Sequence, residues 1–211
     1  MQIVAPLYEG FTALDVVGPY EVLSRLPGAE VVFAAERPGP VRTDMGLSLV
    51  AERALAEVTA PDVVLVPGGP GTQAALGDSA LLDWLRAVDP GTTWTTSVCS
   101  GSLLLAAAGL LTGRRAACHW LALEHLPLFG AVPSEERIVF EGKYATAAGV
   151  SAGIDLALTL AGRVAGDAVA QAIQLVVEYA PEPPYTTGSV ATSPPSLVSA
   201  LRASNLRVPP L

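Results

Sequence analysis

The apolar run at residues 62–67 constrains the fold of this chain more than any other segment. Every position between Asp62 and Pro67 is Val or Leu, with no alternation of polar residues. A continuous run of this kind is typical of a strand that is buried on both faces. The glycine-rich segment at 68–71 follows at once and requires a loop. Helices must therefore cover both faces of the sheet that contains this strand.

Other β-compatible runs alternate along the chain with runs of helical spacing. We expect further strands at residues 2–7, 30–35 and 93–98, and shorter ones at 47–51, 115–118 and 143–147. We expect helices at residues 11–26 (restarted at Gly18 and Pro19), 79–88 (capped by Ser79), 101–108 (stopped near Gly109), 151–164 and 167–179. This alternation predicts an α/β fold with a mostly parallel central sheet.

The length of 211 residues predicts one domain over residues 1–211. Residues 180–211 are rich in Pro, Ser and Thr, which indicates an extended C-terminal arm with one helical piece near residues 196–203. Hydrophobic residues make up 51% of the chain, which is too many for a disordered protein. Together with the arm, this apolar composition leads us to expect a homodimer.

Charge and hydropathy argue against several classes of function. The formal net charge is −8 and Lys and Arg do not cluster, so we expect no nucleic-acid partner. Apolar stretches such as residues 103–111 are too short for a bilayer, which takes about 20 residues. The first residues lack a basic region and a cleavage site, so we expect a cytoplasmic protein without a membrane partner. The two cysteines are too few for a zinc site, and we expect neither a metal nor a disulfide.

Three suggestive segments fall at the ends of predicted strands. They are the loop at Gly68 and Gly69, the turn at Cys99, and residues 148–150. In a mostly parallel sheet, ligands bind beyond the carboxyl ends of the strands. The sequence therefore predicts that these segments meet in one site.

Cys99 lies where a strand rich in β-branched residues runs directly into Ser100, Gly101 and a helix. A tight strand-to-helix turn exposes a nucleophile, and nearby backbone N–H groups stabilise negative charge. We expect this setting to lower the pKa of the thiol. The alternative is a buried structural cysteine, which is also our expectation for Cys118.

Asp15 is an acidic residue in an otherwise apolar stretch. If it is buried near the cysteine, its pKa rises and it becomes a general acid and base. The alternative is an N-cap for a helix that begins near Pro19.

The remaining candidates are backbone donors and histidines. The loop at Gly69 and Pro70 either offers N–H groups to an anionic intermediate or makes a tight turn, and it lacks the Lys of a phosphate loop. His119 could reach the cleft at the strand ends, or it is a hydrogen-bonded structural residue. His125 is expected to be peripheral.

Five segments of the chain occur in the order seen in the DJ-1/PfpI superfamily. They are residues 15–19 (Asp-Val-Val-Gly-Pro), 67–71 (Pro-Gly-Gly-Pro-Gly), 97–101 (Ser-Val-Cys-Ser-Gly), 118–120 (Cys-His-Trp) and 149–155 (Gly-Val-Ser-Ala-Gly-Ile-Asp). The chain resembles this superfamily from Gln2 to about Val198. Within it the chain is most similar to the isocyanide (isonitrile) hydratases, because residues 174–185 resemble their C-terminal segment.

The resemblance implies a flavodoxin-like three-layer sandwich, similar to class I glutamine amidotransferases, in a homodimer without metal or organic cofactor. It implies that Cys99 attacks the terminal carbon of an isocyanide, and that water releases the resulting thioimidate as an N-substituted formamide. It also implies that Asp15 transfers protons. The other residues that it places in or near the site are Ser100, Gly69, Pro70, Gly149, Val150 and, behind them, His119.

Two departures from the hydratase pattern stand out. Thr usually follows the cysteine in that group, whereas Ser100 keeps the hydroxyl but lacks the methyl that restricts the rotamer. Cys118 replaces the Thr often found before the His-Trp pair, which puts a hydrogen bond from this position in doubt. Other branches fit less well, because proteases and chaperones carry His where Ser100 stands, and DJ-1-like and glyoxalase branches carry Glu where Asp15 stands.

The rival function is binding rather than catalysis. Many AraC-type transcription regulators join this domain to helix-turn-helix units, but here the chain ends near Leu211 without a basic tail, so we expect no DNA-reading part. A ligand sensor, or a sensor of oxidants that acts through Cys99, is the alternative to an enzyme. A catalyst turns over an isocyanide, whereas a sensor only binds it or is oxidised.

Overall fold

The structure is a computed structural model that describes residues 1–204, so the last part of the expected arm, residues 205–211, lies outside the described residues. The chain divides into two compact units, Met1–Val177 and Glu178–Leu211. The described part of the second unit holds a short 3₁₀ helix, η4 (Val190–Thr192), and helix α7 (Pro195–Ala203). Helix α7 confirms the helical piece expected near residues 196–203.

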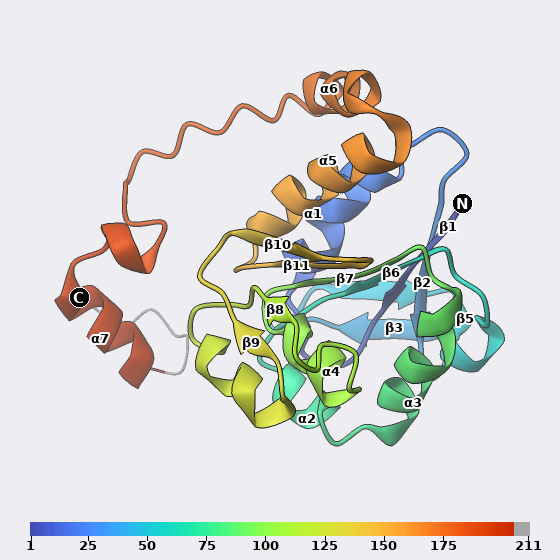
Figure 1. Ribbon diagram of the computed structural model, residues 1–211, viewed down its shortest axis with the longest axis horizontal. Coiled ribbons are helices and arrows are strands. Elements are labelled where there is room, and N and C mark those ends of the chain that lie inside the picture. The colour runs from blue at the N-terminus through green and yellow to red at the C-terminus, as the bar shows by residue number, and fades with distance from the viewer. Residues whose placement is uncertain (205–211) are drawn as a thin grey trace. The chain divides into compact units, whose positions relative to one another are not determined.

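A seven-stranded sheet forms the middle layer of the first unit (Figure 1). Neighbouring strands are parallel throughout, except for the antiparallel pair β10–β11 at one edge. This sheet confirms the predicted α/β fold. Its strands, in order across the sheet, are β10 (Ile138–Glu141), β11 (Tyr144–Ala147), β7 (Trp94–Val98), β6 (Val63–Val66), β1 (Gln2–Pro6), β2 (Glu30–Ala35) and β5 (Arg53–Ala54).

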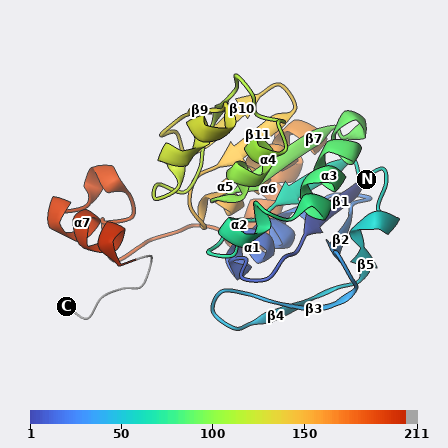
Figure 2. The same ribbon diagram turned by 90° about the horizontal axis from the view of Figure 1, so that it is seen from below.

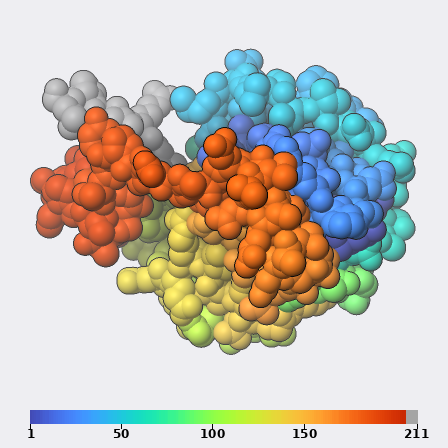
Figure 3. All heavy atoms as spheres, turned by 90° about the horizontal axis from the view of Figure 1, so that it is seen from above, coloured from blue at the N-terminus to red at the C-terminus, as the bar shows by residue number. Residues whose placement is uncertain are grey.

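Helices cover both faces of this sheet (Figures 1 and 2). One face carries α1 (Ala13–Leu23), α5 (Ala152–Ala165) and α6 (Asp167–Val176), which lie side by side in the space-filling view of Figure 3. The other face carries α2 (Thr72–Ala75), α3 (Ser79–Val88) and α4 (Gly101–Ala107). The three layers agree with the sandwich that the resemblance implied. Among residues 1–204, no helix is long and apolar enough to cross a membrane.

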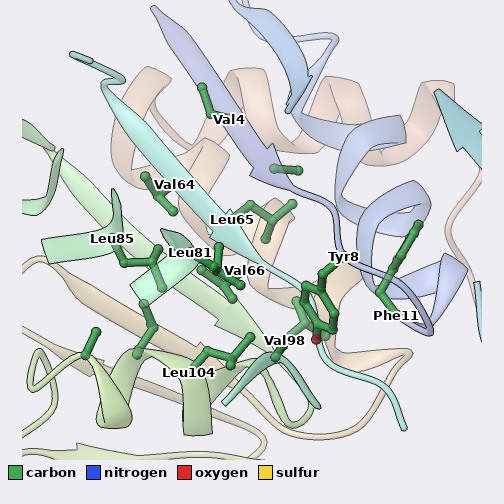
Figure 4. Close-up of a cluster of buried hydrophobic side chains, with 14 of the residues drawn as sticks. Val4, Tyr8, Phe11, Val64, Leu65, Val66, Leu81, Leu85, Val98 and Leu104 are labelled. Carbon is green, nitrogen blue, oxygen red and sulfur yellow. The ribbon is translucent and has the colours of Figure 1, made fainter. Parts of the chain in front are cut away.

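Alternate residues of the buried strands pack on opposite faces of the sheet. Ile3 and Val63 belong to the hydrophobic cluster formed with α1, α5 and α6. Val4 and Val64 belong to the cluster on the other face, shown in Figure 4 with side chains of α3 and α4. All four side chains are at most 1% exposed, so the apolar run at residues 62–67 is buried on both faces, as predicted.

The remaining elements are short. Strand β3 (Gly39–Arg42) pairs antiparallel with β4 (Ser48–Ala51), and β8 (Arg115–Ala116) pairs with β9 (Val132–Pro133). The strand expected at 47–51 is therefore part of a hairpin outside the central sheet, and the strand expected at 115–118 ends two residues early. Three 3₁₀ helices complete the first unit: η1 (Leu55–Glu57), η2 (Asp89–Gly91) and η3 (Leu123–Phe129).

The expected restart of the first helix is wrong. Helix α1 runs without a break through Gly18 and Pro19. A proline inside a helix removes one hydrogen bond, and close packing against α5 offsets this loss. A Cβ added to Gly18 would lie 2.9 Å from the Cγ1 of Ile154, a residue of α5. The Pro19 ring likewise lies close to Gly153, which is also on α5.

The expected cap of α3 is also wrong. The N-cap is Asp78, whose Oδ1 accepts a hydrogen bond of 3.1 Å from the backbone N–H of Leu81. Ser79 is instead the first residue inside the helix. The predicted cap therefore lies one residue away from the observed one.

We predict that Asp78→Ala lowers the free energy of unfolding by about 1 kcal/mol, because the first turn of α3 loses its side-chain acceptor. The matched control is Ser79→Ala, which should change it by less than about 0.5 kcal/mol. Chemical denaturation followed by tryptophan fluorescence measures both, since Trp84, Trp94 and Trp120 all lie in the first unit. A larger loss from Ser79→Ala than from Asp78→Ala would contradict the assignment.

Candidate active site

Cys99 occupies a strained turn between β7 and α4. Its backbone φ is +60°, and the other non-glycine residue with a positive φ among residues 1–204 is Glu178. The Cys99 N–H donates to the carbonyl of Ala148 at 2.8 Å, which ties the turn to the end of β11. A non-glycine residue held in this region of φ is typical of a nucleophile elbow. The structure therefore confirms the tight strand-to-helix turn predicted at Cys99.

The ends of β6, β7 and β11 meet around this turn. Gly68, just after β6, lies so close to the elbow that an added Cβ would fall 2.3 Å from the backbone nitrogen of Ser100. Only glycine allows these two backbone segments to approach this closely. The Gly68 carbonyl also accepts a hydrogen bond of 2.8 Å from the N–H of Thr12, the residue that precedes α1. The three predicted segments therefore lie together, as expected from their positions at strand ends.

Asp15 is fully buried in the first turn of α1 and points toward these strand ends. Its Oδ2 accepts a hydrogen bond of 2.8 Å from the N–H of Gly68. Its Oδ1 has no protein partner with ordinary hydrogen-bond geometry in the described part of the chain. The alternative reading of Asp15 as a helix cap is wrong, because α1 begins at Ala13 and Thr12 is its N-cap.

Burial raises the pKa of the Asp15 carboxyl from its ordinary value of 3.8 to about 7. The hydrogen bond from Gly68 and an interaction with the Cys99 thiol both lower this pKa, while the charge of Asp44 raises it. The increase in pKa caused by removal from water is larger than the decrease caused by these two hydrogen-bonding groups. A carboxyl with a pKa of about 7 can accept and return a proton at neutral pH, which agrees with the first of the two alternatives for Asp15.

The pKa of Cys99 moves in the opposite direction from our expectation. Burial raises the pKa of the thiol well above its ordinary value, and the charge of Asp15 raises it further. Backbone N–H groups of Ser100 and Val150 lower it, as expected for a helix-start elbow, but they are outweighed. The resting form is therefore a thiol. A reaction at this sulfur needs a proton acceptor, and Asp15 is the adjacent one.

Ser100 presents its backbone and its side chain to different partners. Its N–H interacts with the Cys99 sulfur, whereas its Oγ accepts a hydrogen bond of 2.9 Å from the N–H of Gly69. The Gly69 N–H is therefore already engaged within the protein. Pro70, next in the loop, has no N–H and is exposed. These contacts indicate that the loop supports the structure of the site, rather than donating several N–H groups to a ligand.

The two histidines differ in position. The His119 ring is partly buried and packs on Gly149, where an added Cβ would lie 2.9 Å from Cδ2. Its Nδ1 accepts a hydrogen bond of 3.3 Å from the N–H of Leu121, which leaves the proton on Nε2, and burial lowers its pKa. His119 thus packs against Gly149, just after the end of β11. His125 is exposed on η3, which agrees with the peripheral position expected for it.

Cys118 is buried, and burial raises the pKa of its thiol to about 12. Both Cys99 and Cys118 are free thiols. Among residues 1–204, no group of three or more His, Cys, Asp or Glu side chains is placed to hold a metal ion.

Sequence reasoning missed two residues of the site, Tyr8 and Thr72. The Tyr8 hydroxyl is 3.0 Å from the Thr72 Oγ1, which is 2.8 Å from the Ser100 Oγ. Tyr8 follows β1 and Thr72 follows the glycine-rich loop. The rule that strand ends meet applied to β1 as well as to β6, β7 and β11, and would have pointed to Tyr8.

Comparison with known proteins relates the chain to one family. The profile described as the DJ-1/PfpI family matches residues 1–163. The isonitrile hydratase of Pseudomonas putida is 41% identical over 202 residues, which are 96% of this chain and 89% of that protein. The HTH-type transcriptional regulator CdhR of Pseudomonas aeruginosa is 35% identical over 118 residues, 54% of this chain and 34% of that protein. Among solved structures, a THiJ/PfpI family protein from Pseudomonas syringae matches with a TM-score of 0.91 at 37% identity, over 97% of this chain and 84% of that chain.

We predict that Asp15→Asn stabilises the protein at pH 8. A rise of the pKa from 3.8 to about 7 corresponds to about 4 kcal/mol of lost stability once the carboxyl is charged in both states. The sign follows from a folded-state pKa above the unfolded one: wild type carries no penalty below about pH 4 and the full penalty above pH 7. Asparagine keeps an acceptor for the Gly68 N–H without the charge.

Denaturation of both proteins from pH 4 to pH 8 measures this effect. The difference in free energy of unfolding between Asp15→Asn and wild type should increase from pH 4 to about pH 7 and then stay constant to pH 8. Asp83→Asn, at an exposed carboxylate of α3, is the matched control and should show no such trend. A gain that does not change with pH, or a loss at pH 8, would contradict the effect of burial on Asp15.

Proposed function

The chain belongs to the DJ-1/PfpI family, and from this premise we propose that it is an isonitrile hydratase-like enzyme that converts isocyanides and water to N-substituted formamides. One observation carries the proposal: a buried carboxyl with a pKa of about 7 lies beside a cysteine held at a nucleophile elbow. This pair can attack an electrophilic carbon and move the protons that the addition requires. The 41% identity to the isonitrile hydratase of Pseudomonas putida supports the choice of substrate class.

In the first step of the proposed reaction, the Cys99 sulfur attacks the terminal carbon of the isocyanide. The thiol proton moves to the Asp15 carboxylate as the C–S bond forms. Asp15 then gives that proton to the same carbon, which yields a thioimidate with a C=N bond. The raised pKa of the thiol supports this order, because the sulfur keeps its proton until the substrate is in place.

In the second step, water adds to the carbon of the thioimidate. Asp15 accepts a proton from the water and delivers it to the nitrogen, so that a tetrahedral intermediate forms. The C–S bond then breaks, the carbonyl of the formamide forms, and the hydroxyl proton returns to sulfur through Asp15. The carboxyl alternates between base and acid in both steps, which is most efficient when its pKa is near the working pH.

The surrounding backbone supports this cycle. The N–H groups of Ser100 and Val150 interact with the sulfur, so they stabilise the charge that develops on it during attack and release. We propose that Gly149 and Val150 line the substrate side of the site, with His119 behind them. The resting hydrogen bonds of Gly69 favour a structural role for the loop at Gly69 and Pro70. The homodimer stays a prediction.

We predict that Cys99→Ala abolishes formamide production from a simple aryl isocyanide, with a fall in kcat of at least about 1,000-fold. Asp15→Asn should lower kcat by about 100- to 10,000-fold, because the thiol loses its proton acceptor. Cys118→Ala, a second buried cysteine without an elbow, is the matched control and should keep kcat within about threefold. Chromatography of the formamide product measures each rate.

Two results would contradict the proposal. One is full turnover by Cys99→Ala. The other is a wild-type protein that turns over no aryl or alkyl isocyanide while Cys99 oxidises readily with dilute peroxide. The second result would favour the sensor function, for which the partial match to the regulator from Pseudomonas aeruginosa provides the supporting observation.

A further inference from the structure

A chain of three buried hydroxyl groups runs beneath the loop at the end of β6. The Tyr8 hydroxyl donates to the carbonyl of Pro67 at 2.8 Å and lies 3.0 Å from the Thr72 Oγ1. The Thr72 Oγ1 lies 2.8 Å from the Ser100 Oγ, which accepts the N–H of Gly69 at 2.9 Å. None of the three hydroxyl-bearing residues is more than 9% exposed. Figure 4 shows the Tyr8 ring at the edge of the buried cluster.

The partners of each hydroxyl limit where its proton can lie. Tyr8 has one proton and gives it to the Pro67 carbonyl, which can only accept. The Thr72 hydroxyl can then donate to Tyr8, and the Ser100 hydroxyl has two acceptors within reach, the Thr72 Oγ1 at 2.8 Å and the Gly69 carbonyl at 3.3 Å. Burial raises the pKa of Tyr8 above its ordinary value, so this hydroxyl keeps its proton at neutral pH. In either case the Ser100 proton has an acceptor within the protein.

Both ends of the hydroxyl chain lie on the same short segment of backbone. The first end is the Pro67 carbonyl and the last is the Gly69 N–H. Between them, the Gly68 N–H donates to Asp15. The Pro67 carbonyl and the Gly68 N–H belong to one peptide group, and in a trans peptide these two atoms point in opposite directions. Tyr8 therefore binds the carbonyl of the same peptide group whose N–H donates to Asp15.

We infer that Tyr8 is a positioning residue for the reaction, and that with Thr72 and Ser100 it orients the Pro67–Gly68 peptide toward Asp15. Without the hydroxyl of Tyr8, this peptide is free to rotate about its neighbouring bonds, and glycine offers little resistance to rotation. Hydrogen bonding at the carbonyl also strengthens the N–H as a donor, because hydrogen bonds in series polarise one another. The role in turnover rests on the proposed function, whereas the effect on Asp15 does not.

The hydrogen bond from Gly68 lowers the pKa of Asp15, so weakening this bond should raise that pKa. Three titratable groups face Asp15 or act on its pKa: Cys99, Asp44 and Tyr8. Of these, Tyr8 stays neutral and acts through the peptide. Charged groups on α1, and on the α5 helix packed against it, have their own contacts: Glu21 with Arg25, Asp155 with Arg137, and Arg163 over the Phe140 ring.

The pH dependence of Cys99 alkylation by iodoacetamide tests this inference without an isocyanide. Above the pKa of Asp15, the carboxylate can take the thiol proton, so the rate should rise with a midpoint near pH 7 and then level off. Asp15→Asn should lack this step, which identifies it. Mass spectrometry of the Cys99 peptide from pH 5 to pH 9 gives the rates and separates them from labelling of Cys118.

Tyr8→Phe, which keeps the ring and removes the hydroxyl, should raise the midpoint by about half to one pH unit. The matched control is Tyr20→Phe on α1, at an exposed tyrosine, which should leave the midpoint unchanged. Thr72→Val should raise the midpoint in the same direction by a smaller amount, and Thr72→Ser, which keeps the hydroxyl, should restore the wild-type value. This pair decides the question if Tyr8→Phe does not fold.

An unchanged midpoint in folded Tyr8→Phe, or equal shifts in Thr72→Val and Thr72→Ser, would overturn the inference. With an aryl isocyanide, Tyr8→Phe should lower kcat about tenfold and leave KM within about twofold, because it acts on proton transfer rather than on binding. If wild type fails to turn over isocyanides but the midpoint shifts, the proposed function fails and this inference stands. If turnover occurs but the midpoint does not shift, the proposed function stands and this inference fails.

Discussion

The hydrogen bond from Gly68 to the buried carboxyl of Asp15 joins helix α1 to the end of strand β6, and the geometry of the site depends on it. This contact places a carboxyl from one helix beside a cysteine from a different strand end. It needs a glycine at position 68, because the same residue also lies against the backbone of the Cys99 elbow. The continuous apolar strand that precedes it is anchored on both faces by the core, so the loop begins from a rigid support.

The site combines several features that each cost folding free energy. Asp15 is removed from water, and Cys99 adopts a positive φ that a side chain disfavours. A large core and close helix packing, such as Gly18 against Ile154, offset such costs. Two titratable groups with raised pKa values in contact are typical of catalytic sites, where the environment is arranged for proton transfer rather than for stability.

Sequence reasoning predicted the parallel sheet and the elbow at Cys99, because each depends on local pattern or on the rule that strand ends meet, but it left Asp15 open between a buried carboxyl and a helix cap. It failed where tertiary contacts decide. Pro19 lies inside α1 because α5 packs against it, and the pKa of Cys99 rises because burial and Asp15 outweigh two N–H groups. The hydroxyl chain through Tyr8 joins residues 64 and 28 positions apart, so no local motif contains it. The hydroxyl of Ser100 contacts both Thr72 and the Gly69 N–H, which explains why a hydroxyl is useful at this position.

We propose that Cys99 forms a covalent intermediate whose formation and release both depend on Asp15. Intact-mass analysis during single turnover of an aryl isocyanide tests it most directly, with peptide mapping to locate the adduct. We predict a mass increase equal to the isocyanide on Cys99 that appears and then decays at the rate of formamide formation. Formamide formation without any adduct on Cys99, or an adduct that never decays, would contradict the account.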